Sequence, residues 1–195
     1  MPGEDHHVAP IHPAYAMLPI RQQDYDLARA KLAEAGYPDG LEITLDCVAS
    51  PQWEQNTCIA IAEMLRPAGI DCSINIMPGG TYWDRWKTTP FGLTAWTHRP
   101  LGTQVLSLAY RSGVPWNESG YASPEFDSML DMAEATLDVE RRRAVMKELE
   151  QTLQADAVFI QPYWRSIFTG STGAVKGYVH HPAEEHHYDR VWLQG

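Results

Sequence analysis

Residues 41–77 read LEITLDCVASPQWEQNTCIAIAEMLRPAGIDCSINIM and predict the central unit of the fold. Its beginning and its end alternate apolar and polar side chains, which is typical of strands with one buried face. The sequence between them predicts a helix that ends near Arg66, because Pro67 and Gly69 are stop signals. A strand, a helix and a strand in this order form a βαβ unit. We therefore expect two parallel strands joined by a right-handed crossover.

The sequence before this unit predicts one helix preceded by an arm. DYDLARAKLAEAGYPDG (24–40) has its apolar residues at helical spacing, and Asp24 or Asp26 can cap the start. Gly36 suits the left-handed position that follows a helix, so we expect the helix to end there. Residues 1–22 are rich in proline and histidine, and we interpret them as an extended N-terminal arm rather than a domain.

The sequence after the βαβ unit predicts short helices, two further strands and a polar tail. In chain order, these elements are a short aromatic helix (79–89), a third strand (91–96), one or two helical turns (103–113), a helix with Ser123 as N-cap (123–137), a helix capped by Asp138 (139–156) and a last strand (157–164). The order of strands and helices indicates an α/β sandwich with one main domain.

The helix after Asp138 has a clear division into two faces. Val145, Leu149 and Leu153 form an apolar stripe at helical spacing. The charged residues on the rest of the helix are expected to stay in water; they are Arg141, Arg142, Lys147, Glu148 and Glu150. Two pairs of carboxylates, Asp127 with Asp131 and Glu148 with Glu150, are accordingly interpreted as solvated surface rather than as acid/base groups.

Composition bounds the class of protein. The chain has 195 residues, 44% hydrophobic and 21% charged, with a formal net charge of -10, which is ordinary for a globular protein. The negative charge argues against nucleic acid or an anionic membrane surface as the main partner. The sequence contains no run of about 18 apolar residues that could span a membrane. The first residues, MPGEDHHVAPIHP, lack the pattern of a signal peptide, which taken alone favours a cytoplasmic protein.

Motif searches identify no cofactor site and leave the cysteines open. Cys47, Cys58 and Cys72 are an odd number without C-x-x-C spacing, which supports neither a disulfide framework nor a zinc site. One pair could be bridged, or all three could be small buried hydrophobic residues. HHPAEEHH (180–187) resembles a zinc motif only superficially, because Pro182 resists a regular helix; we interpret it as a solvated loop with weak metal binding as the alternative.

Aromatic residues cluster in the sequence around the third predicted strand. They could form part of the core, or they could form an aromatic wall for a small ligand, with indole N–H groups as orienting donors. These residues are Tyr82, Trp83, Trp86, Trp96, Trp116 and Tyr121.

The chain resembles the large solute-binding proteins of ABC importers, in the oligopeptide, dipeptide and nickel class known as extracellular solute-binding family 5. The resemblance covers about residues 20–180 and is carried by five segments in the family's order. They are YDLARAKLAEAGYPDGLEITL, IAEMLRPAGIDCSINIM, FGLTAW with the loop after it, NESGYASPEFDSMLDMAEATLDVERRRAVMKELEQTLQADAVFIQPYW, and VKGYV.

The resemblance implies a non-enzymatic receptor that traps its ligand between two lobes. It implies the α/β fold of a periplasmic binding protein lobe (type II, cluster C), with a mixed sheet flanked by helices and the N-terminal lobe missing. Residues 1–22 would be the arm, residues 23–173 the C-terminal lobe, and residues 174–195 a tail that returns to the missing lobe. The full-length parent would be periplasmic, would bind peptides or small organic solutes, and would dock on ABC permease subunits. No cofactor or metal is implied.

The resemblance also implies a ligand contact at Arg99. In peptide-binding members a Trp ends the third strand, and an Asp three residues later pairs with the amino terminus of the peptide. Trp96 matches the Trp, but Arg99 replaces the Asp, so we expect an anionic ligand group rather than an ammonium. Alternatively, Arg99 pairs with a nearby acid and only shapes the loop. The full set of expected ligand residues is Arg99, Trp96, Thr97, His98, Tyr82, Trp116, Asn117 and Tyr121.

Two other functional hypotheses stay open at the level of sequence. One is a metal-binding protein or metal-assisted hydrolase that uses His98 or the histidine-rich tail, although no known metal motif is present. The other is a truncated lobe without a ligand that self-associates, as a homodimer for example, through surface that the missing lobe would cover.

Overall fold

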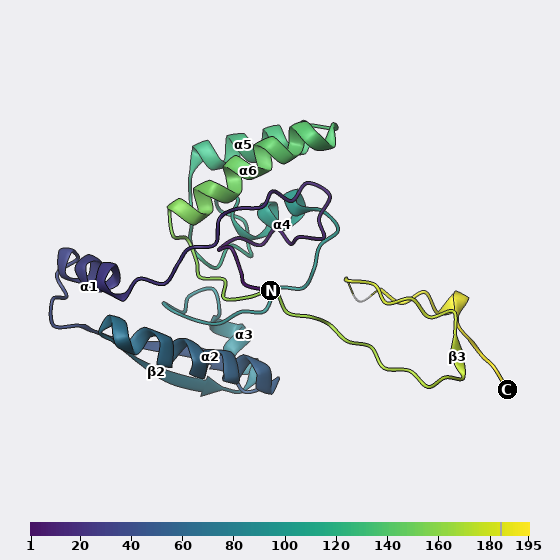
Figure 1. Ribbon diagram of the computed structural model, residues 1–195, viewed down its shortest axis with the longest axis horizontal. Coiled ribbons are helices and arrows are strands. Elements are labelled where there is room, and N and C mark those ends of the chain that lie inside the picture. The colour runs from purple at the N-terminus through teal and green to yellow at the C-terminus, as the bar shows by residue number, and fades with distance from the viewer. Residues whose placement is uncertain (184) are drawn as a thin grey trace. The chain divides into compact units, whose positions relative to one another are not determined.

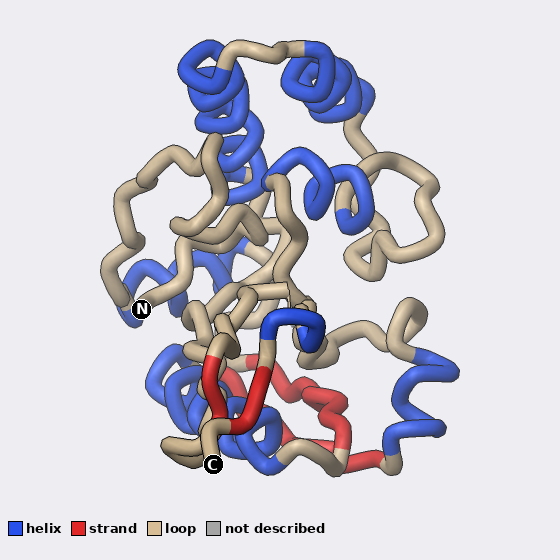
Figure 2. Tube along the Cα trace, turned by 90° about the vertical axis from the view of Figure 1, so that its right-hand side faces the viewer, coloured by secondary structure: helices blue, strands red, loops and turns tan. Residues whose placement is uncertain are grey.

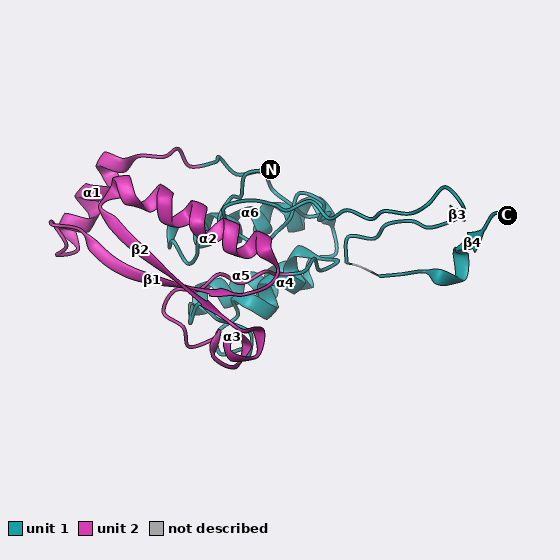
Figure 3. Cartoon of the chain, turned by 90° about the horizontal axis from the view of Figure 1, so that it is seen from below, with its two compact units in different colours: residues 1–20, 97–195 teal, residues 21–96 magenta. Residues whose placement is uncertain are grey.

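The computed structural model describes residues 1–183 and 185–195, and these residues form two compact units (Figure 3). Unit 1 comprises residues 1–20 and 97–195, and unit 2 comprises residues 21–96. Much of the chain is loop, drawn tan in Figure 2.

The elements labelled in Figure 1 follow the predicted order with few exceptions. Unit 2 contains α1 (Tyr25–Glu34), β1 (Leu41–Val48), α2 (Gln52–Leu65), the 3-10 helix η1 (Arg66–Ala68), β2 (Ile70–Met77) and α3 (Gly79–Arg85). Unit 1 contains α4 (Gly102–Ala109), α5 (Pro124–Ala135), α6 (Val139–Ala155), β3 (Val175–Lys176), the 3-10 helix η2 (Tyr188–Arg190) and β4 (Trp192–Leu193).

The predicted βαβ unit is confirmed. β1 and β2 are parallel, in a register that runs from Leu41 opposite Ile70 to Val48 opposite Met77. Their alternating pattern supplies the apolar face on which α2 packs, and Leu45, Cys47 and Cys58 form the buried centre of this contact. η1 then turns the chain back, because Gly69 adopts the left-handed φ of 85° that closes the helix.

The predicted third strand, residues 91–96, is reduced to a single bridge. The amide of Asp46 donates to the carbonyl of Phe91, and the amide of Leu93 donates to the carbonyl of Asp46, as in a parallel ladder. The next bond of such a ladder would use the Leu93 carbonyl, but the hydroxyl of Tyr82 donates to it at 2.7 Å. A side chain therefore occupies the acceptor at which a longer strand would continue, and the prediction of a full strand is wrong.

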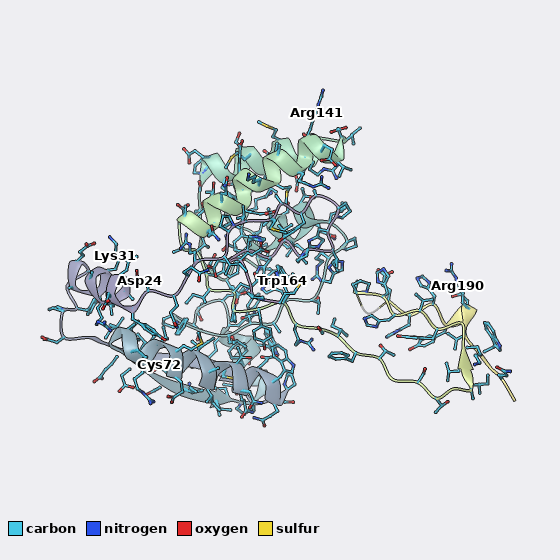
Figure 4. All side chains as sticks on the ribbon, viewed as in Figure 1. Asp24, Lys31, Cys72, Arg141, Trp164 and Arg190 are labelled. Atoms are coloured by element: carbon cyan, nitrogen blue, oxygen red, sulfur yellow. The ribbon has the colours of Figure 1, made fainter. Side chains whose placement is uncertain are left out.

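The three helix starts that were predicted from caps agree with the structure, at Asp24, Ser123 and Asp138. The Asp24 carboxylate accepts the Leu27 amide at 2.8 Å in α1, and the Asp138 carboxylate accepts the Arg141 amide at 2.8 Å in α6. Figure 4 shows Asp24 and Lys31 on α1, none of whose residues is buried. The polar cap and the glycine turn therefore define this helix more than apolar packing does.

Replacing Ser123 by Ala should lower the free energy of unfolding by about 1 kcal/mol. The Ser123 hydroxyl accepts the Phe126 amide at 3.2 Å, and alanine would leave that amide at the start of α5 without its acceptor. Urea unfolding followed by circular dichroism measures the change, with exposed Ser171→Ala as the matched control. Equal stability of the two variants would show that the cap contributes nothing.

The N-terminal segment, residues 1–20, contains no helix or regular strand and packs in unit 1. Five of its apolar residues are buried, whereas Met1, Ile11, Met17 and Ile20 are exposed; the buried ones are Val8, Ala9, Ala14, Ala16 and Leu18. Its first residues pair with the end of the predicted last strand, since the Gly3 amide donates to the Pro162 carbonyl and the Trp164 amide to the Met1 carbonyl. The prediction of a strand over 157–164 is wrong beyond this one bridge, because Pro162 has no amide to donate.

α5 and α6 lie side by side (Figure 1). Glu150 of α6, which was expected at the surface, lies between α6 and the N-terminal segment. Of the predicted apolar stripe of α6, Leu149 and Leu153 are buried, whereas Val145 is only partly buried and its neighbour Met146 is buried instead. Glu150 was expected in water but is fully buried. The reason is tertiary, since Glu4 and His6 of the N-terminal segment lie against it.

The tail forms a small separate sheet. β3 and β4 are antiparallel, with Val175 opposite Leu193 and Lys176 opposite Trp192. The described residues contain two two-stranded sheets, β1–β2 and β3–β4. Parallel pairing occurs in the first sheet and antiparallel pairing in the second. Within the described residues, no helix has the length and apolar character needed to cross a membrane.

Candidate ligand-binding loop around Arg99

The guanidinium of Arg99 is held by its own loop along one edge only. Its Nη1 donates to the Thr97 hydroxyl at 2.7 Å, with longer contacts of 3.4 Å to the carbonyls of Thr97 and His98. Among the described residues, Nε and Nη2 have no hydrogen-bond partner, and no carboxylate pairs with Arg99. The other edge of the guanidinium carries Nε–H and Nη2–H. These two N–H groups are spaced to bind both oxygens of a carboxylate.

An indole forms one wall of this site. The guanidinium carbon of Arg99 lies 5.9 Å from the ring centroid of Trp116, a cation–π distance. About half of the Trp116 side chain is exposed. The contact limits the directions that the guanidinium can take while leaving aromatic surface open beside it.

Two histidines fix the loop to the N-terminal segment. The Ala9 amide donates to Nδ1 of His12 at 2.7 Å, so the proton of the neutral ring is on Nε2, which donates to the Arg99 carbonyl at 2.7 Å. The His98 ring stacks on His12 with centroids 4.8 Å apart. Burial lowers the pKa of His12, and burial together with the charges of His181 and Arg99 lowers that of His98. Both rings are therefore neutral at pH 7.

Asn117 is hydrogen-bonded within its own loop, and Tyr121 is hydrogen-bonded to the residue that follows α6. The Asn117 amide donates to the carbonyls of Tyr121 at 2.7 Å and Arg111 at 3.2 Å, and its oxygen accepts the Ser119 hydroxyl. The Tyr121 hydroxyl donates to Asp156 at 2.7 Å, and burial with this hydrogen bond raises the pKa of Tyr121 to about 12. These contacts hold the loop that carries Trp116, and direct contact of Asn117 or Tyr121 with a ligand stays a prediction.

The expected ligand residues fall into both units. Thr97, His98, Arg99 and Trp116 come together in unit 1, whereas Tyr82 and Trp96 belong to unit 2. Tyr82 is fully buried, packs edge-on against Trp83 and closes a core cluster with Val48 and Met77. These neighbours favour the interpretation of Tyr82 as a core residue. Contact of Tyr82 with a ligand stays a prediction.

A second titratable cluster in unit 1 was missed by the sequence analysis. Nε2 of His6 lies 3.8 Å from Glu4 and 3.6 Å from Glu150, and all three side chains are buried. Burial, with the nearby Glu4 carboxylate, raises the pKa of Glu150 to about 9, while burial lowers the pKa of His6 to about 4. The Trp164 ring, labelled in Figure 4, lies 6.4 Å from His6. No local pattern marks this cluster, because Glu150 lies more than 140 residues from Glu4 and His6 in the sequence.

The tail histidines have local partners in the structure. The Thr169 hydroxyl and Nδ1 of His180 are 2.8 Å apart, and the Ala183 amide donates to Nδ1 of His181 at 3.2 Å. The His186 ring stacks on Tyr188. Within the described residues, no three histidine, cysteine or acidic side chains are arranged to hold a metal ion.

A family model and a curated protein match this chain in sequence. The family model for bacterial extracellular solute-binding proteins, family 5 Middle, matches residues 2–118. The dipeptide-binding protein DppE of Bacillus subtilis (strain 168) is 24% identical over 167 residues, which are 84% of this chain and 31% of DppE.

Two solved structures extend the comparison to the fold. The periplasmic binding protein DppA of Helicobacter pylori, in complex with the peptide STSA, is 23% identical with a TM-score of 0.72, over 88% of this chain and 35% of DppA. The binding protein MoaA of A. tumefaciens R10, in complex with mannopinic acid, is 19% identical with a TM-score of 0.63, over 69% of this chain and 29% of MoaA.

These matches confirm the predicted fold class, an α/β lobe of the periplasmic-binding-protein type. The chain spans about a third of the length of each of these relatives. The match to the family model covers more than half of the chain, and this chain belongs to the bacterial extracellular solute-binding proteins of family 5.

Proposed function

We propose that this chain is part of the solute receptor of an ABC uptake transporter and binds a ligand that presents a carboxylate. No bond is made or broken in this function. The ligand closes the receptor, and the closed form docks on permease subunits outside the cytoplasmic membrane. Residues 23–173 would form the C-terminal lobe, with residues 1–22 as its arm and residues 174–195 as a tail that contacts the rest of the receptor.

The observation that carries the proposal is the open edge of Arg99. A guanidinium whose N–H groups all donate within its own loop would have a structural role. In Arg99, Nε and Nη2 do not donate within the loop, and no acidic side chain among the described residues pairs with it. An ammonium group beside it would be repelled, whereas a carboxylate gains charge-assisted bonds of about 1.5–3 kcal/mol each. The MoaA complex with mannopinic acid supports an acid as one ligand class of this fold.

The peptide-binding relatives support a second form of the same ligand group. DppE is named a dipeptide-binding protein, and DppA is solved with the peptide STSA. A peptide also carries a carboxylate, at its C-terminus. Arg99 would therefore bind the carboxyl end of a peptide, or a small organic acid, and would not bind a peptide by its amino end.

Replacing Arg99 by Ala in the complete receptor should weaken binding of a small organic acid at least tenfold, which corresponds to about 1.4 kcal/mol. Calorimetric titration with organic acids and with dipeptides measures the effect. Arg141→Ala is the matched control, because it removes the same charge from an exposed position of α6, where Figure 4 labels it. The chain by itself should show little or no affinity, because most of a receptor is absent. Unchanged affinity of the Arg99 variant would show that this loop does not bind the ligand.

A further inference from the structure

Two of the three cysteines are neighbours in the core of unit 2. Cys47 on β1 and Cys58 on α2 are both fully buried, and together with Leu45 they make one cluster of buried residues. They pack in this one cluster, and each thiol contributes to the shifted pKa of the other. Figure 1 shows why, since α2 runs along the strand pair that carries Cys47. All three cysteines are free thiols in the structure.

The register of the sheet excludes Cys72 as the partner of Cys47. Cys72 lies opposite Ile43, whereas Cys47 lies opposite Ile76, four positions further along the strands. At about 3.3 Å per residue, four positions separate the two cysteines by about 13 Å. A disulfide requires Cα atoms within about 7 Å. Cys58 is therefore the only cysteine of the chain that Cys47 can reach, while Cys72, labelled in Figure 4, lies on β2 and is partly exposed.

Burial determines when such a bond can form. It raises the pKa of both thiols, so the thiolate that attacks a disulfide is scarce once the core has closed. Oxidation would have to take place while the chain folds, and the finished bond would be protected from reductant. The family is extracellular, and oxidising compartments outside the cytoplasm permit structural disulfides. The inference thus shares the compartment of the proposed function but does not depend on any ligand.

We propose that Cys47 and Cys58 form an intramolecular disulfide during folding in an oxidising compartment, and that Cys72 stays a free thiol. The two thiols lose two protons and two electrons as the S–S bond forms. A small disulfide such as oxidised glutathione, or an oxidised thiol-disulfide exchange protein, accepts the electrons and becomes two thiols. The bond would tie β1 to α2 across the turn that connects them, and would restrict the unfolded chain.

Peptide mapping tests the pairing directly. The chain is refolded with oxidised and reduced glutathione, alkylated, and digested with a protease that cleaves after glutamate. Cleavage after Glu54 and Glu63 puts the three cysteines on three different peptides, 43–54, 55–63 and 64–118. The expected result is a linked pair of peptides 43–54 and 55–63, with Cys72 alkylated. Three alkylated cysteines, or a link from Cys58 to Cys72, would overturn the proposal.

Unfolding in the presence and absence of reductant gives an independent measurement. The urea midpoint of the oxidised chain should be higher than that of the reduced chain, and Cys72→Ser should show the same difference. Cys47→Ser should show none, because the bond cannot form. In the folded oxidised chain, reductant should cleave the bond only when urea is added. An equal midpoint with and without reductant for Cys72→Ser would also contradict the proposal, even if Cys47→Ser failed to fold.

Discussion

Acidification below pH 6.5 should destabilise unit 1, because burial holds several of its histidines in the neutral form. Burial lowers the pKa of His6 to about 4, of His7 to about 3, and of His12 below its usual value of 6.5. The His7 ring packs between Tyr110 and Phe159. Since these folded-state pKa values lie below the unfolded value, the unfolded chain binds more protons, and stability is lost as the pH falls from 6.5 toward 4.

Glu150 acts in the opposite direction. Its raised folded-state pKa, about 9 instead of 4.5, means that the folded chain holds a proton that the unfolded chain has released. Stability from this group is therefore present below pH 4.5 and is lost as the pH rises toward 9. Between pH 4.5 and 6.5, His6 and His7 each favour the unfolded chain by up to one proton and Glu150 favours the folded chain by one, which leaves a net of about one. At about 1.4 kcal/mol per proton, these three groups should lower the stability by up to roughly 1.4 kcal/mol per pH unit, and the lowered pKa values of His12 and His98 add to this slope.

Urea unfolding at several pH values between 7.5 and 4.5, followed by tryptophan fluorescence, measures this slope. His6→Asn should reduce the slope by about 1.4 kcal/mol per pH unit, because Asn keeps an acceptor for the Val8 amide but does not titrate. His180→Asn removes a histidine from the exposed tail and should leave the slope unchanged. A free energy of unfolding that is constant from pH 6.5 to 4.5 would show that these histidines are not buried in the neutral form.

Replacing Phe126 by Ala should cost about 3–5 kcal/mol of unfolding free energy, the range for deleting a large buried side chain. Phe126 lies in the first turn of α5, is fully buried, and meets the rings of Tyr110 and Tyr121 edge-on at 6.4 and 5.5 Å. Alanine would leave a cavity among rigid aromatic neighbours that cannot close over it. The loop that carries Trp116 is held by Tyr121, so binding at Arg99 should weaken as well.

Phe168→Ala is the matched control for this variant. The Phe168 side chain is 89% exposed, and its removal should change the unfolding free energy by less than about 0.5 kcal/mol. Denaturant unfolding of the two variants under the same conditions compares them. A loss below 1 kcal/mol for Phe126→Ala would mean that the packing between α5 and its neighbours does not hold unit 1 together.

The sequence pointed to the candidate ligand-binding loop around Arg99 but not to its geometry. Arg99 and Trp116 were both expected near a ligand, and the structure brings them within a cation–π distance. The part played by His12 could not be predicted, because its hydrogen bond to the Arg99 carbonyl joins residues 87 positions apart. Tyr82 gave an aromatic signal that did not distinguish a ligand wall from a core, and the structure buries it completely.

The sequence by itself determined the elements whose causes are local. The alternation in β1 and β2, the helical spacing in α2, and the side-chain caps at Asp24, Ser123 and Asp138 act over a few residues, so they can be read in order along the chain. The same segments also carried the resemblance to family 5.

Tertiary structure alone decided where strands stop and which charges are buried. Residues 91–96 form only one bridge with β1, because the Tyr82 hydroxyl donates to the Leu93 carbonyl. Residues 157–164 form only one bridge, with the N-terminal segment. Glu150 has the helical position of a surface residue, yet Glu4 and His6 cover it. Burial depends on which distant segment lies on a face, and periodicity along one element carries no information about that neighbour.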